Sequence, residues 1–246
     1  MKLSILKIGG HIINDSATLT EALTHFSKLE GLKILVHGGG RKASQVLQKM
    51  GITPKMINGR RITDEITLEV VTMVYAGLIN KNIVAQLQNL NCQAIGMTGA
   101  DLNSIQSHKR VVKTIDYGYA GDIDMVNTTA IQKLLEADFT PVFCSITHNQ
   151  KGQLLNTNAD TIASALAVAL SKKYDVTLKF HFEKTGVLLD VNDENSLIKD
   201  LNQSYYQILR SENKIFDGMI PKIDNAFDAL KNGVQKVYIG NTMINN

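Results

Sequence analysis

Three consecutive glycines, Gly38-Gly39-Gly40, separate a short apolar stretch from a helical pattern. The apolar stretch covers residues 32–36, and apolar residues at helical spacing follow the glycines up to about residue 50. α/β proteins use this order of strand, glycines and helix to present backbone N–H groups to an anion. Glycine also lets a ligand approach the main chain, because it has no Cβ. The pattern predicts an anion-binding loop in an α/β fold, and the alternative is a plain strand-to-helix turn.

A second glycine turn, Gly9-Gly10, ends another apolar strand, which is predicted over residues 3–8. A helix predicted over residues 18–29 connects this strand to the next one, as in a parallel sheet. If the two strands are neighbours, both glycine turns open at the same carboxyl edge, where α/β proteins bind ligands. Lys7 lies on the first strand, and a lysine is costly to bury unless it meets an anion. Together these features favour a phosphoryl site over an exposed or snorkelling lysine.

The remaining chain alternates between apolar and amphipathic stretches, and a turn at residues 149–152 separates two units, residues 1–150 and 151–246. Asp15 or Ser16 is expected to cap the first helix, and Thr63-Asp64 a long later one. Further helices are predicted over residues 66–90, 131–136, 161–170, 201–210 and 219–230, strands over residues 94–97, 141–146, 175–182 and 236–239, and hairpins over residues 55–62 and 111–126.

Composition limits the possible functions. The chain has 246 residues, of which 44% are hydrophobic, so it can bury a large core in one α/β domain or in two joined lobes. The net charge of +3 is too small to indicate a nucleic-acid partner. Cys92 and Cys144 are expected to be buried thiols in a reducing compartment. We found no signal peptide and no apolar stretch near the ~20 residues of a membrane span, so a cytoplasmic protein is expected.

Other common site motifs are missing or incomplete. There is no Walker A motif, and residues 38–43 formally fit the dinucleotide pattern G-x-G-x-x-A. A dinucleotide-binding turn should follow the first strand, and an acidic residue should end the next strand. The nearest acidic residues here, Asp64 and Glu65, are instead expected to cap a helix. The six histidines have no metal-ligand spacing, and neither cysteine nor any serine has a nucleophile motif. The dinucleotide interpretation is therefore disfavoured, and no metal site is predicted.

Three polar clusters could take part in binding or catalysis. Arg60-Arg61 follows the turn Asn58-Gly59, and arginine suits bidentate pairing with a carboxylate, although a solvated turn is the simpler reading. Residues 156–160, Asn-Thr-Asn-Ala-Asp, contain more polar groups than a helix cap needs. Lys222 follows Pro221 at a helix start and is either a surface lysine or a second cation for phosphoryl transfer.

In their order along the chain, these motifs resemble the amino acid kinase family. The resemblance is carried by residues 7–10 (Lys-Ile-Gly-Gly), 36–40 (Val-His-Gly-Gly-Gly), 58–63 (Asn-Gly-Arg-Arg-Ile-Thr), 155–160 (Leu-Asn-Thr-Asn-Ala-Asp) and 217–222 (Asp-Gly-Met-Ile-Pro-Lys). It implies a three-layer αβα sandwich with a mostly parallel central sheet. Residues 1–150 would bind an acyl-amino-acid and form a dimer interface, and residues 151–246 would bind ATP.

The resemblance also implies a reaction. ATP would phosphorylate the γ-carboxylate of an N-acyl-L-glutamate in arginine biosynthesis, with Mg²⁺ bound through the nucleotide phosphates. N-acetyl-L-glutamate is the expected substrate, and the alternatives are N-succinyl-L-glutamate, another activity of the family, or a non-catalytic ligand-binding module. The carboxylate is already a nucleophile, so alignment and charge neutralisation are the main needs.

Site roles follow from the resemblance residue by residue. Lys7 and Lys222 would stabilise the transferring phosphoryl group, with Asp160 orienting both lysines. The expected phosphoryl-binding backbone is Gly9, Gly10 and Gly39; the expected substrate-binding residues are Gly39, Gly40, Arg61, Asn156 and Asn158; and the expected nucleotide-binding residues are Glu183, Lys184, Gly186 and Phe216.

Two departures from the family pattern have consequences. The nucleotide turn usually has a hydroxyl residue followed by Asp, but here it has Phe182 and Glu183, so its nucleotide contacts should differ. The chain also lacks the N-terminal helical extension of arginine-inhibited hexameric relatives. We therefore expect a homodimer without arginine feedback.

Overall fold

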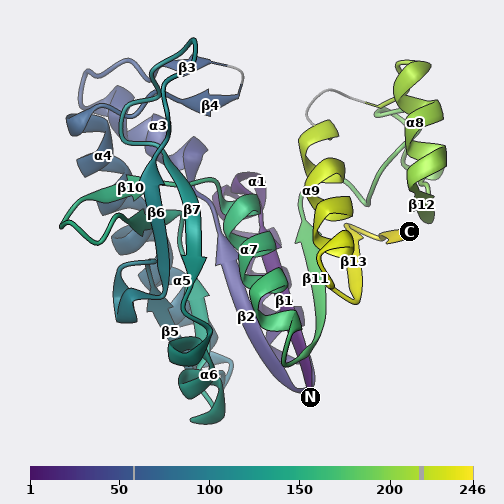
Figure 1. Cartoon of the computed structure of the whole chain (residues 1–246), viewed down its shortest axis with the longest axis horizontal. Coiled ribbons are helices and arrows are strands. Elements are labelled where there is room, and N and C mark those ends of the chain that lie inside the picture. The colour runs from purple at the N-terminus through teal and green to yellow at the C-terminus, as the bar shows by residue number, and fades with distance from the viewer. Residues whose placement is uncertain (58, 216–218, 246) are drawn as a thin grey trace.

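The computed structural model of the chain describes residues 1–57, 59–215 and 219–245. An eight-stranded sheet with the order β12-β14-β13-β11-β1-β2-β8-β5 crosses the molecule (Figure 1). All neighbouring strands in this sheet are parallel except β13 and β14. The strands are β1 (Lys2–Ile8), β2 (Leu32–His37), β5 (Ala94–Met97), β8 (Thr140–Phe143), β11 (Asp175–His181), β12 (Asp200–Asn202), β13 (Lys236–Ile239) and β14 (Thr242–Asn245).

The first strand lies in the middle of this sheet, between β2 and β11. Ile8 is level with His37 on one side and with His181 on the other, so the carboxyl ends of all three strands lie at one edge. Both glycine turns follow directly from these ends. The condition stated for the sequence is therefore met: β1 and β2 are neighbours, and their turns lie at the same edge.

Helices cover both faces of the sheet because successive strand residues point to opposite faces. Leu3 and Ile5 belong to one buried cluster, whereas Leu6 and Ile8 belong to the other. The first cluster is completed by α6 (Thr128–Glu136), α7 (Ala159–Ser171), α8 (Gln203–Ser211) and α9 (Ile220–Lys231), and the second by α1 (Gly10–Asn14), α2 (Ser16–Ser27), α3 (Gly40–Lys49), α4 (Glu65–Thr72) and α5 (Asn80–Asn89). The expected mostly parallel αβα sandwich is confirmed.

The predicted long helix is capped as expected but is interrupted. The Asp64 carboxylate accepts a hydrogen bond from the Thr67 N–H at the start of α4, and Asp15 caps α2 in the same way. Between α4 and α5 lies a π-helical segment, η1 (Met73–Ile79). π-Helical turns are rare and are frequent at functional sites.

The stretch from Glu65 to Asn89 also corrects an expectation. It is long and apolar enough to cross a membrane by length and composition, although no such stretch was expected from the sequence. Within the fold, 44% of its most apolar window is buried, and Val70, Val74 and Ile83 belong to the second buried cluster. Its apolar character therefore fits a core helix.

A second sheet lies above the first at the left of Figure 1 and has the order β10-β9-β6-β7. Its strands are β6 (Ile105–Lys109), β7 (Gly121–Val126), β9 (Ile146–His148) and β10 (Leu154–Asn156), and the hairpin of β3 (Met56–Ile57) and β4 (Arg60–Arg61) lies nearby. Two short 3₁₀ turns, Asp101–Asn103 and Glu194–Ser196, complete the elements. Asn58 in the hairpin turn lies outside the described residues.

Tertiary pairing changed two of the predicted elements. The strand predicted over residues 141–146 is split, because the chain leaves the central sheet after β8 and enters the second sheet at β9. The hairpin predicted over residues 111–126 is formed by β6 and β7, and β6 precedes the predicted range.

Cys92 and Cys144 are free and buried, as expected. Burial raises the pKa of the Cys144 thiol to about 12.

Candidate active site

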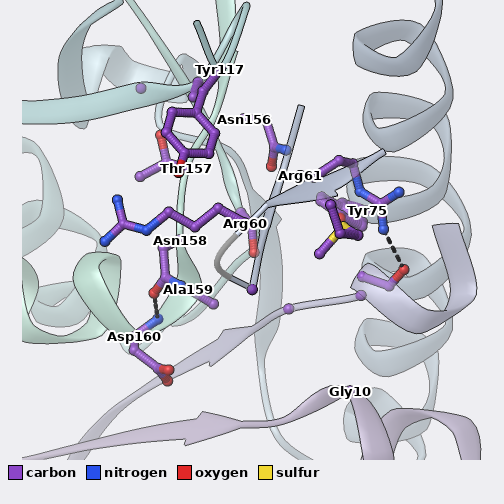
Figure 2. A pocket seen from close by; sticks show the side chains of 18 of the residues that line it. Gly10, Arg60, Arg61, Tyr75, Tyr117, Asn156, Thr157, Asn158, Ala159 and Asp160 are labelled. Atoms are coloured by element: carbon purple, nitrogen blue, oxygen red, sulfur yellow. Dashed lines mark hydrogen bonds between the residues drawn. The ribbon is translucent and has the colours of Figure 1, made fainter. Parts of the chain in front are cut away.

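A cavity of about 240 Å³ opens at the carboxyl edge of β1 and β2. Figure 2 shows its walls, which come from the glycine turns, the β3–β4 hairpin, η1, the second sheet and the start of α7. The lining includes nine residues that carry chemistry or leave the backbone open, namely Lys7, Gly10, Gly39, Gly40, Arg61, Tyr75, Asn156, Asn158 and Asp160. Eight of the predicted substrate, phosphoryl and catalytic positions are thus brought together with Tyr75.

Lys7 and Asp160 form an ion pair at the floor of this cavity. The Lys7 Nζ lies 2.6 Å from the Asp160 Oδ1, and the two side chains are 10% and 14% exposed. Lys7 is the penultimate residue of β1, and Asp160 lies in the first turn of α7, where the helix dipole favours an acidic side chain. Both residues line the cavity, so the pair keeps a positive charge next to the space that a ligand would occupy.

The middle glycine of the loop, Gly39, leaves no room for a side chain. A Cβ on Gly39 would come within 2.5 Å of the Ile79 Cδ1 and 2.7 Å of the Tyr75 Cδ1. Gly39 precedes the first turn of α3, so its backbone belongs to the helix N-terminus that attracts anions. Gly39 therefore allows both the close packing of η1 and access of a ligand to the main chain.

Gly9 and Gly10 have different surroundings. The Gly9 N–H donates to the His181 carbonyl oxygen at 3.1 Å, which ties the turn to β11. Gly10 opens α1 and lines the cavity, whereas Gly9 is not part of its lining. Of the two predicted phosphoryl-binding amides in this turn, the Gly9 amide is already engaged within the fold, and only Gly10 faces the cavity.

Arg61 is the most deeply buried arginine of the cavity wall, with 8% of its surface exposed. Its Nη2 donates to the Gly40 carbonyl oxygen at 2.9 Å and to the Ser44 Oγ at 2.7 Å. Its Nη1 is buried and has no hydrogen-bond partner among the described residues. A buried guanidinium with a vacant donor is destabilising unless an acceptor reaches it, and a carboxylate is the acceptor that matches its geometry.

The two asparagines of the cavity lining are held by the fold. The Asn156 Nδ2 donates to the Thr63 Oγ1 at 3.0 Å. The Asn158 Oδ1 accepts from the backbone N–H groups of Asp160 and Thr161 and caps α7 (Figure 2). Both residues line the cavity. The simpler interpretation of this segment, that one of its polar side chains caps a helix, is also correct for Asn158.

Sequence patterns did not identify several wall residues. Tyr75 comes from η1, and burial raises the pKa of its hydroxyl while the Arg61 charge opposes that shift. Arg110 binds Asp122 and lies over the Tyr117 ring, 5.5 Å from its centroid. The hydrogen bond from Arg110 lowers the pKa of Asp122. Tyr75 lies on a helix face, and Arg110 and Tyr117 lie on a loop; neither segment has a motif spacing, so no sequence signal marked these three wall residues.

A second cavity, of about 290 Å³, adjoins the end of β11. Its lining is largely apolar, and the predicted nucleotide-binding residues Glu183, Lys184 and Gly186 belong to it together with Lys222. The Lys222 Nζ lies 5.9 Å from the centroid of the Phe182 ring. Phe216, the remaining predicted nucleotide contact, lies outside the described residues.

Gly9 lies between the linings of the two cavities. A Cβ there would be 4.0 Å from the Lys7 Nζ and 3.8 Å from the Phe182 Cβ. Lys7 lines the first cavity and Phe182 the second. The structure therefore brings Lys7 and Asp160 into direct contact and places Lys222 beside the adjoining cavity. This arrangement suits transfer of a group between two ligands.

Comparison with known proteins agrees with the motifs. The model of the amino acid kinase family matches residues 2–241. The chain is 51% identical over 238 residues to the acetylglutamate kinase of Bacteroides fragilis, covering 97% of this chain and 91% of that protein. It is 50% identical over 239 residues to the acetylglutamate kinase of Cytophaga hutchinsonii, with 97% and 90% covered.

A solved structure shows the same fold. The protein smu.665 from Streptococcus mutans UA159 superimposes with a TM-score of 0.80 at 26% sequence identity, covering 98% of both chains. The sheet order, the glycine turns at one edge and the sequence match over nearly the whole length agree with one another. The chain belongs to the amino acid kinase family.

Proposed function

We propose that this chain is an ATP-dependent kinase that phosphorylates the γ-carboxylate of an N-acyl-L-glutamate in arginine biosynthesis. The observation that carries the proposal is the buried Lys7–Asp160 pair at the glycine-lined edge of the sheet. The identity of about 50% to acetylglutamate kinases supports it and makes N-acetyl-L-glutamate the first substrate to test. Residues 1–150 supply most of the acyl-glutamate site, and residues 151–246 supply the ATP site.

The proposed chemistry is an in-line phosphoryl transfer. One γ-carboxylate oxygen forms a bond to the γ-phosphorus of ATP while the bond from that phosphorus to the β,γ-bridging oxygen breaks, so ADP leaves with the bonding pair. No proton has to be removed, because the nucleophile is already an anion. Lys7 and Lys222 reduce the charge repulsion between the two anions, and Asp160 keeps Lys7 in place. The backbone N–H groups of Gly10 and Gly39 bind the phosphoryl oxygens.

The other wall residues hold the acyl-glutamate. The vacant Nη1 of Arg61 donates to the α-carboxylate, and Asn156 and Asn158 contact the amide region, with the backbone at Gly39 and Gly40 against the chain of the substrate. Holding both ends of the substrate aligns the γ-carboxylate with the γ-phosphorus of ATP, so the bound substrate adopts a near-attack geometry.

ATP occupies the second cavity in this proposal, with Glu183, Lys184, Gly186 and Phe216 as its contacts. The apolar walls from Phe182 and Val187 suit an adenine ring. The part of the chain that the structure describes contains no group of three or more His, Cys, Asp and Glu side chains arranged to hold a metal ion. Mg²⁺ enters this proposal as an ion carried by ATP, because Mg²⁺ keeps several waters and binds through substrate phosphates with few carboxylates.

One observation favours N-succinyl-L-glutamate as a second candidate substrate. Arg60 also lines the cavity, and in Figure 2 it extends in the opposite direction from Arg61. Among the described residues the Arg60 side chain forms no hydrogen bond or ion pair, although its charge contributes to the lowered pKa of Asp122. An N-acetyl group carries no charge that could use this guanidinium, whereas a succinyl group ends in a carboxylate.

An ADP-release assay decides between these readings. Acetyl-glutamate, succinyl-glutamate, free glutamate, aspartate and UMP are compared at equal concentration, with Arg60→Leu as the variant that tests the acyl group. Succinyl-glutamate kinase activity that falls selectively in Arg60→Leu supports the second candidate, and preference for acetyl-glutamate in both proteins refutes it. Activity only with free glutamate, aspartate or UMP would contradict the whole proposal. ATP binding without turnover would favour a non-catalytic module.

We also propose that the protein is a cytoplasmic homodimer. The long helix exposes Ile66, Met73 and Leu78, and contact with a second copy would remove such side chains from water. Two buried free cysteines suit a reducing compartment. Light scattering coupled to size exclusion measures the mass, and a monomer at micromolar concentration would contradict the dimer.

A further inference from the structure

His37 is a buried histidine at the entrance of the glycine loop, and the phosphoryl-transfer scheme above gives it no role. It is the last residue of β2 and has no exposed surface. Its Nδ1 lies 2.8 Å from the carbonyl oxygen of Gly38, and its Nε2 lies 3.0 Å from the Nδ2 of Asn80. The ring thus connects the first glycine of the loop to the start of α5.

The partners of Asn80 determine which ring nitrogen carries the proton. The Asn80 Nδ2 lies 2.9 Å from the Val142 carbonyl oxygen, and the Lys81 ammonium lies 3.3 Å from the Asn80 Oδ1. A carbonyl oxygen can only accept and an ammonium can only donate, so the orientation of the amide is fixed. The Asn80 Nδ2 therefore donates to the His37 Nε2, and the ring proton must be on Nδ1, which donates to Gly38. Burial lowers the pKa of His37 to about 4, so the ring is neutral at pH 7.

The carbonyl that His37 holds belongs to the peptide unit between Gly38 and Gly39. In a planar trans peptide the C=O and the N–H point in opposite directions. Holding the Gly38 oxygen at the ring therefore directs the Gly39 N–H away from the ring. Glycine on both sides makes rotation of this peptide easy, because neither residue has a Cβ to oppose it. A rotated peptide would present a partial negative charge to an anionic ligand, whereas the held peptide presents a donor.

We propose that His37 and Asn80 are positioning residues that fix the Gly38–Gly39 peptide, so that the Gly39 N–H faces the transferring phosphoryl group. This inference rests on the proposed kinase function. His37 contacts neither substrate, and it acts through the glycine loop.

The π-helical segment η1 explains how Asn80 reaches the ring. The Asn80 N–H donates to the Tyr75 carbonyl oxygen, five residues earlier, which is the hydrogen bond of a π-helix. This bond brings Tyr75, Ile79 and Asn80 to the same side of the helix. Tyr75 and Ile79 form the steric wall against Gly39, and Asn80 holds His37. One irregular turn thus controls both the position of the loop and the direction of its amide.

Substitutions at His37 separate positioning from packing. His37→Leu removes the donor to Gly38, whereas His37→Asn keeps an amide nitrogen near the position of Nδ1. Loss of one oxyanion-hole donor lowers kcat about 10²–10³-fold. In His37→Leu the Gly39 N–H should be misoriented only part of the time, so kcat should fall at least about tenfold with KM nearly unchanged. His37→Asn should recover most of kcat. Thr140→Val is the matched control, because it removes a buried hydrogen bond with Cys92 at the opposite edge of the sheet.

Each outcome has a defined meaning. Unchanged kcat in a folded His37→Leu protein, or equal losses in the Leu and Asn variants at equal melting temperature, would overturn the proposal. A loss in Thr140→Val as large as in His37→Leu would assign the effect to stability instead. The ¹⁵N shifts of the His37 ring give a readout without turnover. We expect a protonated Nδ1 and an unprotonated Nε2 at pH 7, and a change of tautomer in Asn80→Leu. A proton on Nε2 in the unaltered protein would refute the positioning role of His37, even if the protein is a kinase. An inactive protein with the expected tautomer would instead refute the kinase function.

Discussion

Replacing Lys7 by alanine should impair both the stability and the turnover of this protein. The Lys7 ammonium lies 2.6 Å from the Asp160 carboxylate, and the side chains are 10% and 14% exposed. Loss of one partner from a buried ion pair destabilises a protein by about 3–5 kcal/mol, because the remaining charge stays poorly solvated. Asp160 is partly exposed, so some water reaches its carboxylate, and the expected loss in unfolding free energy is about 3 kcal/mol.

The kinetic effect should be larger on kcat than on KM. The ammonium opposes charge that gathers between two anions in the transition state, and removal of one such group lowers kcat about 10²–10³-fold. The KM values should change less than about fivefold, because Arg61 and the second cavity supply binding that is present before the reaction. Lys222→Ala should show the same kinetic pattern.

A double variant separates the two effects. Lys7→Met combined with Asp160→Leu replaces the ion pair with apolar side chains of similar size, which should restore most of the stability. Activity should stay low, because the positive charge is still missing. Urea unfolding measures stability, and coupled ADP release measures kcat and KM. Near-normal turnover in Lys7→Ala, or recovered turnover in the double variant, would refute the role of Lys7.

Three further predictions follow from individual contacts. Gly39→Ala should abolish most activity and lower the melting temperature, because its Cβ would lie 2.5 Å from the Ile79 Cδ1. Gly77→Ala is its control, since a Cβ there meets nothing within 4 Å and should stabilise the helix by up to about 1 kcal/mol. Arg61→Lys should raise the KM for acyl-glutamate about 10–100-fold with a smaller change in kcat, because lysine cannot replace a bidentate guanidinium, and an unchanged KM would exclude Arg61 as the carboxylate anchor. His37 titrates near 6.5 when unfolded and at about 4 when folded, so its contribution to stability is complete above pH 6.5 and is lost as the pH falls toward 4. At about 1.4 kcal/mol per pKa unit, the unfolding free energy should fall by up to about 3 kcal/mol over that interval, and His37→Asn should lack this component in urea titrations.

Local patterns were sufficient for most elements of the fold. Strands such as β1 and β2 are apolar stretches that end in glycine, and the N-caps Asp15 and Asp64 are side chains that bond to a backbone N–H three residues later. These features depend on neighbours in the sequence, so composition and spacing reveal them. The order of the motifs along the chain was likewise enough to assign the family, because matching that order requires no information about which residues are in contact.

Tertiary structure determined what these elements form together. Lys7 and Asp160 are far apart in the chain, and they meet because β1 lies beside β2 with α7 across the same face (Figure 1). Tyr75 and Arg110 entered the cavity wall without any motif, through a π-helical turn and a loop. The apolar stretch from Glu65 to Asn89 is a core helix only because the second cluster packs against it. Such contacts depend on long-range packing, which spacing along the chain does not encode. The sequence by itself therefore determined the glycine turns and the lysine at the end of β1, and the tertiary structure decided which groups lie around them.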